Sequence, residues 1–193
     1  MEATNTIKTI ERISPLERAM KVATQRGWGP LTDEDKAALD DAVRMVTHLD
    51  WQSMRYLIDT HIFIWYAREQ FKLTRDVLAI FEDYESELYV SSETLKELVL
   101  LWNSKPHIRR WWKSPLDLLR SVEDEYGIRV AYLHKEHYET YAKLQLNEAQ
   151  EHNDPSDHLI IAQAITNHMP LISADTRFPF YTRQGLDLIY NKG

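Results

Sequence analysis

Two short apolar runs in this chain each lead into an aspartate, and this repeated pattern constrains the fold more than any other feature. Residues 56–58 run directly into Asp59, and residues 171–173 are followed by Ala174 and Asp175. An amphipathic run follows Asp59 at once, which predicts a buried strand that leads into a helix. In open α/β sheets the site lies at the carboxyl ends of the strands. The pattern therefore predicts carboxylates gathered along one edge of a sheet.

Further apolar runs alternate with helical patterns along residues 54–193. Additional strands are predicted at 88–90, 128–132 and 186–190, and helices at 60–68, 74–84, 93–103, 116–125, 135–149 and 154–168. Strands that alternate with helices favour a parallel sheet covered on both faces. The sequence therefore predicts an α/β fold with three layers, α/β/α, around a central, mostly parallel sheet.

Residues 1–53 have a different pattern and are predicted to form a helical N-terminal extension to a domain at 54–193. Ser14 and Thr32 are helix starts, and Asp35 completes a capping box with Thr32. A turn at 27–30 separates the two helices. No catalytic constellation occurs in this extension, and we hypothesise that its helices pack on the domain that follows.

The charge and composition exclude several classes of protein. A formal net charge of −7 argues against nucleic-acid binding by bulk charge, but not against an enzyme with an acidic metal site. The absence of cysteine excludes disulfides and thiolate ligands. No apolar run approaches the roughly 18 residues of a membrane helix, and the polar N-terminus does not resemble a signal peptide. A cytoplasmic protein without a membrane partner is expected.

Two further carboxylates join the aspartates that follow the strands. Glu97 lies in the helix after the second strand and borders an apolar face that includes Leu98 and Leu101, whereas Glu93 one turn earlier is a competitor. Asp157 lies in the first turn of a helix that Asp154 begins. Each aspartate has a simpler interpretation as a helix cap or a turn residue, worth roughly 0.3–1 kcal/mol at a helix N-terminus. Capping and metal binding do not exclude each other.

Together these residues predict a metal site formed by Asp59, Glu97, Asp157 and Asp175. Carboxylate oxygens suit Mg²⁺ or Mn²⁺. Four carboxylates crowded together repel one another unless a cation holds them. A metal held in this way can orient water and offset the charge that develops on a phosphate during hydrolysis.

The order of these motifs resembles that of the PIN-domain nucleases, and most closely the VapC-type toxins of toxin–antitoxin pairs. The segments that carry the resemblance are RYLIDTH at 55–61, YVS at 89–91 with LKEL at 95–98, DPSDHLIIAQA at 154–164 and PLISAD at 170–175. Each segment alone is a weak signal, but the four in this order and spacing are strong. The resemblance covers residues 54–193, and residues 1–53 have no counterpart in it.

The resemblance implies a Mg²⁺- or Mn²⁺-dependent endoribonuclease that acts on tRNA or rRNA, forms a homodimer and is inhibited by a cognate antitoxin. Cleavage would leave a 5′-phosphate and a 3′-hydroxyl. It carries over Asp59, Glu97 and Asp157 as the core acids and Asp175 as the fourth, usually less essential one. Thr60 and Ser173 lie where the family often has small polar helpers.

Two positions depart from the family pattern. Ser156 stands where an aromatic residue is common, and His158 stands where arginine is common. Neither changes the metal prediction, but both are expected to alter the surface that faces RNA.

A basic and aromatic segment at 105–113 is a candidate RNA contact in an otherwise acidic chain. Arg109, Arg110 and Lys113 are predicted to meet phosphates. The neighbouring Trp111 and Trp112 have a simpler interpretation as core or dimer anchors, which we favour for them.

Two other functions fit the same fold. A catalytically silent PIN-like module that binds RNA or protein is consistent with the acidic net charge, but the presence of all four acids argues against it. A structure-specific DNA nuclease shares the metal chemistry and is a weaker alternative.

Overall fold

The computed structural model describes residues 32, 35–36 and 54–192, so the remaining predictions for the N-terminal extension lie outside the described residues. Within the extension, the backbone N–H of Asp35 donates to Thr32 Oγ1 at 3.1 Å, and that of Thr32 donates to Asp35 Oδ2 at 2.9 Å. The predicted capping box is therefore confirmed. The segments Arg55–Leu78 and Glu87–Gly193 form one compact unit, which contains the sheet and the candidate site.

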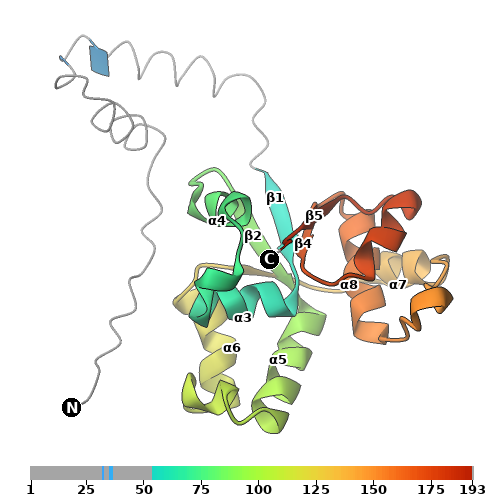
Figure 1. Ribbon diagram of the computed structural model, residues 1–193, viewed down its shortest axis with the longest axis horizontal. Coiled ribbons are helices and arrows are strands. Elements are labelled where there is room, and N and C mark those ends of the chain that lie inside the picture. Colours follow the sequence, from blue (N-terminus) through green and yellow to red (C-terminus); the bar gives the residue numbers. More distant parts are fainter. Residues whose placement is uncertain (1–31, 33–34, 37–53, 193) are drawn as a thin grey trace. The chain divides into compact units, whose positions relative to one another are not determined.

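The centre of this unit is a five-stranded sheet in which every pairing is parallel (Figure 1). The strands are β1 (Arg55–Ile58), β2 (Glu87–Ser91), β3 (Arg129–Ala131), β4 (Leu171–Ser173) and β5 (Leu188–Tyr190). Their order across the sheet is β3-β2-β1-β4-β5, so β1 lies in the middle between β2 and β4. The strand order reverses direction at β1, which places the carboxyl ends of β1 and β4 at a topological switch point.

The helices fall into two groups around the sheet. They are α3 (Thr60–Arg68), α4 (Arg75–Glu82), α5 (Ser92–Ser104), α6 (Pro115–Asp124), α7 (Lys135–Tyr141) and α8 (Pro155–Thr166). Short 3₁₀ turns are η1 (Gln70–Lys72), η2 (Ile108–Arg110), η3 (Glu148–Gln150) and η4 (Phe178–Gln184). Right-handed crossovers place α3, α5 and α6 on one face of the sheet and α7, α8 and η4 on the other. The three-layer α/β/α prediction is confirmed.

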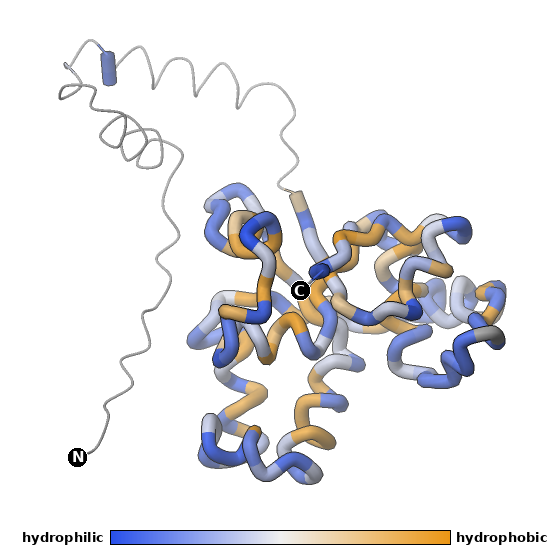
Figure 2. Tube along the Cα trace, in the orientation of Figure 1, coloured by the Kyte–Doolittle hydropathy of each residue, from blue (hydrophilic) through white to orange (hydrophobic). Residues whose placement is uncertain are grey.

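The core packs the middle of the sheet against α8 and η4. Five residues of this core are fully buried: Leu57, Ile160, Ile161, Leu171 and Phe178. Hydrophobic residues, orange in Figure 2, concentrate along these segments. Burying a side chain of this size contributes roughly 1.5–3 kcal/mol. This packing fixes α8 against β1 and β4, and so fixes the first turn of α8 at the carboxyl edge of the sheet.

Most predicted elements end within two residues of the observed bounds, but one helix is much shorter than predicted. The helix predicted over 135–149 ends at Tyr141, and a separate 3₁₀ turn covers Glu148–Gln150. In the segment that follows, Asn147 is buried and its backbone N–H donates to the hydroxyl of Tyr181 at 3.3 Å. A tertiary contact, and not a helical hydrogen bond, therefore satisfies this N–H.

Along the described part of the chain, every helix is too short or too polar to cross a bilayer.

Candidate metal centre

The predicted acids meet in a pocket of about 270 Å³ at the carboxyl ends of β1 and β4. Asp59, Glu97, Asp157 and Asp175 all line it, although they come from four separate segments. The other lining residues are Thr60, His61, Leu100, Leu101, Asp154 and Arg177. The structure thus brings together every acid that the sequence pattern singled out.

Asp59 is held at the end of β1 by two donors. It is the N-cap of α3, and one carboxylate oxygen accepts the backbone N–H of Thr60 at 2.6 Å. The other oxygen accepts the hydroxyl of Ser173 at 2.8 Å. Burial raises the pKa of Asp59, against the opposing effect of the Ser173 hydrogen bond. Asp59 therefore caps a helix and also lines the pocket, as the two interpretations of the sequence allowed.

Glu97 enters the pocket from α5. The hydroxyl of Thr60 donates to its carboxylate, which fixes the side chain across from Asp59. Burial raises the pKa of Glu97, and the negative charge of Asp59 raises it further. The competitor Glu93 pairs with Lys96 instead. Of the two glutamates on α5, Glu97 therefore contributes to the pocket and Glu93 does not.

The carboxyl group of Asp157 has a strongly raised pKa. Burial raises its pKa to about 8, and the surrounding carboxylates of Asp59, Asp154 and Glu97 add to the shift. Oxygens of Glu97, Asp154 and Asp157 all lie within 4.8 Å of one another. Three carboxylates this close, with one of them reluctant to ionise, form an oxygen donor set of the kind that binds a hard divalent cation.

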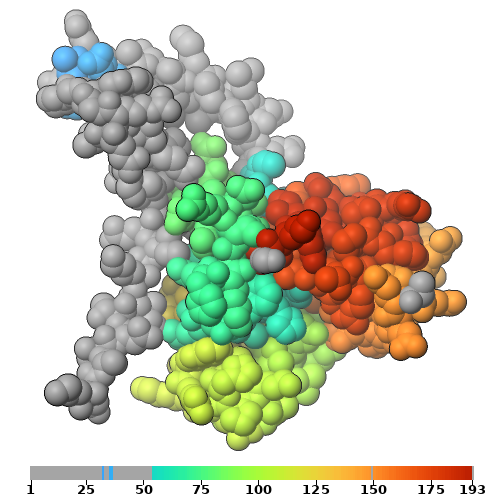
Figure 3. Space-filling model, viewed as in Figure 1, coloured from blue at the N-terminus to red at the C-terminus, as the bar shows by residue number. Residues whose placement is uncertain are grey.

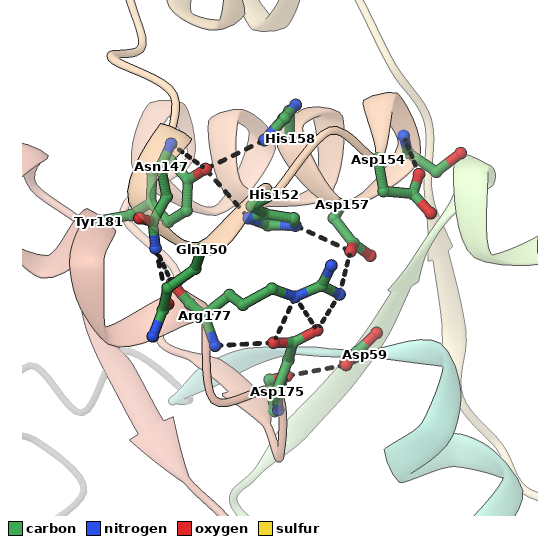
Figure 4. Close-up of polar contacts among 12 residues, drawn as sticks. Asp59, Asn147, Gln150, His152, Asp154, Asp157, His158, Asp175, Arg177 and Tyr181 are labelled. Atoms are coloured by element: carbon green, nitrogen blue, oxygen red, sulfur yellow. Dashed lines mark hydrogen bonds and ion pairs between the residues drawn. The ribbon is translucent and has the colours of Figure 1, made fainter.

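Arg177 is a resident cation beside these acids. In Figure 4 its guanidinium extends across Asp175, and Nε lies 3.0 and 3.1 Å from the two carboxylate oxygens. Its Nη2 also lies 3.3 Å from Asp157 Oδ2. Burial alone would raise the pKa of Asp175, but the hydrogen bonds and charge of Arg177 outweigh it and lower the pKa. Sequence reasoning missed Arg177, although its position two residues after Asp175 was a local signal.

A buried chain of hydrogen bonds supports Asp157 from behind (Figure 4). His152 Nε2 lies 2.9 Å from Asp157 Oδ2, and His152 Nδ1 lies 3.0 Å from the hydroxyl of Tyr181. The same hydroxyl lies 3.0 Å from His158 Nε2 and accepts the backbone N–H of Asn147 at 3.3 Å. No local sequence pattern predicts these hydrogen bonds, because the residues that make them lie on three segments that only the fold brings together.

The directions of these hydrogen bonds depend on the protonation of Asp157. Burial lowers the pKa of His152 to about 4, so the ring is neutral near pH 7 and carries one N–H. Without metal, Asp157 holds a proton below about pH 8 and can donate to His152 Nε2; once ionised it can only accept, and His152 Nε2 must then donate. In either state the hydrogen bond to His152 orients the carboxyl group of Asp157.

Two residues that depart from the family pattern are buried rather than exposed. Ser156 is 7% exposed and His158 is 1% exposed, and His158 belongs to the chain behind Asp157. The expectation that they shape an RNA-facing surface is therefore wrong. Both side chains are buried because the first turn of α8 packs against the interior of the domain.

The basic segment near η2 lies apart from the residues that line the acid pocket. Arg109 donates from Nε to the carbonyl of Trp102 at 2.9 Å and also to the carbonyl of Asn103, so it caps the C-terminal end of α5. Trp112 is buried and donates to Ser121 Oγ at 3.0 Å, which agrees with a core anchor. Arg110 and Lys113 are exposed, and their contact with RNA stays a prediction.

Replacing Arg177 with glutamine is expected to destabilise the metal-free protein by about 1–2 kcal/mol, a fall in Tm of about 2–8 °C. The guanidinium lowers the pKa of Asp175, so its stabilisation is present above the ordinary pKa and is lost as the pH falls through the lowered one. The deficit measured by thermal unfolding should therefore shrink in acid. Arg129→Gln, which removes a more exposed pair with Glu87, is the control and should change little.

Comparison with known proteins places this geometry in context. Residues 56–183 match the family model described as the PIN domain. Among curated proteins, no sequence matches the chain. The solved structure of VapBC2 from Rickettsia felis bound to a promoter DNA fragment is similar, with a TM-score of 0.54 at 16% identity over 72% of this chain and 100% of that one.

Two further solved structures have the same fold. VapBC-1 from nontypeable Haemophilus influenzae is similar with a TM-score of 0.53 at 16% identity, over 71% of this chain and 98% of that one. DNA-bound VapBC from Salmonella typhimurium gives a TM-score of 0.52 at 15% identity, over 72% and 99% of the two chains.

Proposed function

Because this chain belongs to the PIN domain family, we propose that it is a metal-dependent endoribonuclease that hydrolyses phosphodiester bonds in RNA, with tRNA or rRNA as the substrate class. The observation that carries the proposal is the acid pocket, in which oxygens of Glu97, Asp154 and Asp157 lie within 4.8 Å of one another. Asp59 and Asp175 line the same pocket. Burial raises the pKa of Asp157, and the crowded carboxylates raise it further when no cation offsets their charge.

The residues present fit Mg²⁺ or Mn²⁺. Glu97, Asp154 and Asp157 would hold the ion, with Asp59 beside them, because hard divalent cations take carboxylate oxygens. Bound there, the ion would supply orientation of a water and compensation of negative charge on the phosphate. We propose that Asp175 contributes through Arg177, which connects it to Asp157.

The chain's own groups position the acids. Thr60 and Ser173 act as helpers: the Thr60 hydroxyl holds Glu97, and the Ser173 hydroxyl holds Asp59. The Arg177 guanidinium lies at the pocket wall and can offset charge on a bound phosphate. Hydrolysis would add water across the bond between phosphorus and the 3′ oxygen, leaving a 5′-phosphate and a 3′-hydroxyl.

We further propose that the protein is the toxin of a toxin–antitoxin pair and acts in the cytoplasm as a homodimer. The sequence motifs resemble those of VapC-type toxins, and the fold is that of three VapBC structures. The implied partner is a cognate antitoxin protein.

The test is incubation of the purified protein with total tRNA and rRNA in the presence of Mg²⁺, Mn²⁺ or EDTA. Discrete cleavage is expected with metal, and none is expected with EDTA or with an Asp59→Asn variant. Calorimetry of metal binding separates the alternatives. A protein that neither binds metal nor cleaves RNA would refute the nuclease proposal and favour a catalytically silent binding module.

A further inference from the structure

A second groove, of about 510 Å³, lies beside the acid pocket and has no part in the proposed metal chemistry. It is formed by the end of α3, η1 and the C-terminal residues after β4 and β5. Three of its lining residues are aromatic (Trp65, Phe71 and Tyr190), and its two charged residues are Lys72 and Lys192. We call this the aromatic groove. On the face seen in Figure 3, the dark red C-terminal residues meet the green surface of α3 and η1.

The wall of the aromatic groove is preformed. Asn191 is 2% exposed, and its side chain bridges the segment after α3 to the end of the chain. Its amide donates to the carbonyl of Lys72 at 2.9 Å, and its carbonyl accepts the backbone N–H of Thr74 at 2.8 Å. A buried amide with both polar atoms satisfied holds its neighbours in place. The groove therefore needs no rearrangement before it can accept a ligand.

The exposed groups in the groove suit a nucleotide. Phe71 is 84% exposed, which is unusual for a large apolar side chain without a partner surface. The ammonium of Lys72 lies 5.6 Å from the ring of Trp65 and 5.9 Å from that of Phe71, so one cation stands over two aromatic faces. Single-stranded nucleic acids bind to surfaces that pair aromatic stacking with positive charge. Lys72 Nζ also lies 2.8 Å from Glu69 Oε2 in a local ion pair, and together with Lys192 it supplies positive charge in a chain whose net charge is −7.

The aromatic groove adjoins the acid pocket through neighbouring residues. His61 lines the pocket and Trp65 lines the groove, and the two rings lie one helical turn apart on α3 with centroids 6.3 Å apart. Ala174 lines the groove and the next residue, Asp175, lines the pocket. An RNA strand whose phosphate lies among the acids can therefore extend past His61 toward the groove.

We propose that the aromatic groove binds a base of single-stranded RNA that flanks the cleaved phosphate, with Phe71 and Trp65 stacking and Lys72 and Lys192 meeting the backbone. The proposal rests on the proposed function, because it assigns a place to the same substrate. It explains why exposed aromatic and basic residues gather at this position on an acidic protein.

The test measures RNA binding without cleavage. A fluorescently labelled single-stranded oligoribonucleotide is titrated in EDTA against the full-length protein, a Phe71→Ala/Lys72→Gln variant and a matched control. The control is Tyr138→Ala/Lys135→Gln on α7, where an exposed aromatic residue likewise accompanies a lysine in a local ion pair. Loss of one stacked base is expected to weaken Kd about 5- to 100-fold in the groove variant only. Thermal unfolding verifies that both variants fold.

The outcomes separate this proposal from the proposed function. A selective loss of affinity supports the groove even if the protein cleaves no RNA. Equal affinities for the two variants, or no RNA binding by the unaltered protein, would overturn the groove proposal even if metal-dependent cleavage is observed. In that case a protein segment becomes the preferred occupant.

Discussion

Replacing Asp157 with asparagine is expected to slow RNA cleavage by about 100-fold or more. The substitution keeps the shape of the side chain but removes one of the three clustered carboxylates. A bound metal contributes several kcal/mol of transition-state stabilisation, and each 1.36 kcal/mol corresponds to about a tenfold change in rate. The measurement is single-turnover cleavage at saturating Mg²⁺ or Mn²⁺. Glu93→Gln, one turn outside the pocket on α5, is the matched control and should retain full activity.

Without metal, the stability of the Asp157→Asn variant should depend on pH differently from that of the unaltered protein. The pKa of Asp157 is about 8 in the folded protein and ordinarily 3.8, so between these values the folded state holds a proton that the unfolded state lacks. The contribution of Asp157 to the stability of the unaltered protein therefore falls as the pH rises from about 4 to about 8. Asparagine cannot titrate, so the variant should gain stability relative to the unaltered protein over this range. A parallel pH dependence of Tm in both proteins would contradict the assigned pKa.

Replacing Tyr181 with phenylalanine is expected to destabilise the protein by about 2–4 kcal/mol, a fall in Tm of about 4–16 °C. Phenylalanine fills the same space but removes the hydroxyl that pairs with His152, His158 and the backbone of Asn147. Their polar atoms would remain buried without a partner, which is the costly outcome. Urea unfolding followed by circular dichroism measures the loss.

A control on another tyrosine separates the hydrogen bonds from the loss of a hydroxyl in general. Tyr138 is 49% exposed, so Tyr138→Phe should change the free energy of unfolding by only a few tenths of a kcal/mol. Cleavage provides a second readout for Tyr181→Phe, because Asp157 loses the orientation that His152 gives it. Full stability in this variant would show that water or another group replaces the hydroxyl.

Much of the fold followed from local pattern. The apolar runs before Asp59 and Asp175 became β1 and β4, and both aspartates lie at the predicted edge of the sheet; that the two strands pair directly was not predicted. The helix after Asp59 has the predicted bounds, because a strong cap and an amphipathic face agree there. The acids were identified for the same reason: each lies just beyond a strand or in the first turns of a helix, and a parallel sheet brings such positions to one edge.

The hydrogen bonds that support Asp157 could not be predicted from the sequence. His152 and Tyr181 are 29 residues apart and meet only because η4 folds back over α8. The helix predicted to continue past Tyr141 does not include Asn147, whose backbone N–H makes a tertiary contact that no local pattern encodes. Periodicity reports which face of an element is buried, but it does not report which polar group on a distant segment satisfies another.

The order of the strands has a consequence for how the protein is made. Asp59 lies early in the domain, but the hydroxyl that holds it belongs to Ser173, 114 residues later. During synthesis the central strand emerges first and its neighbour β4 nearly last, so a nascent chain cannot close the acid pocket until almost all of the domain has left the ribosome. The proposed nuclease activity would therefore belong to the finished chain and not to a partly synthesised one.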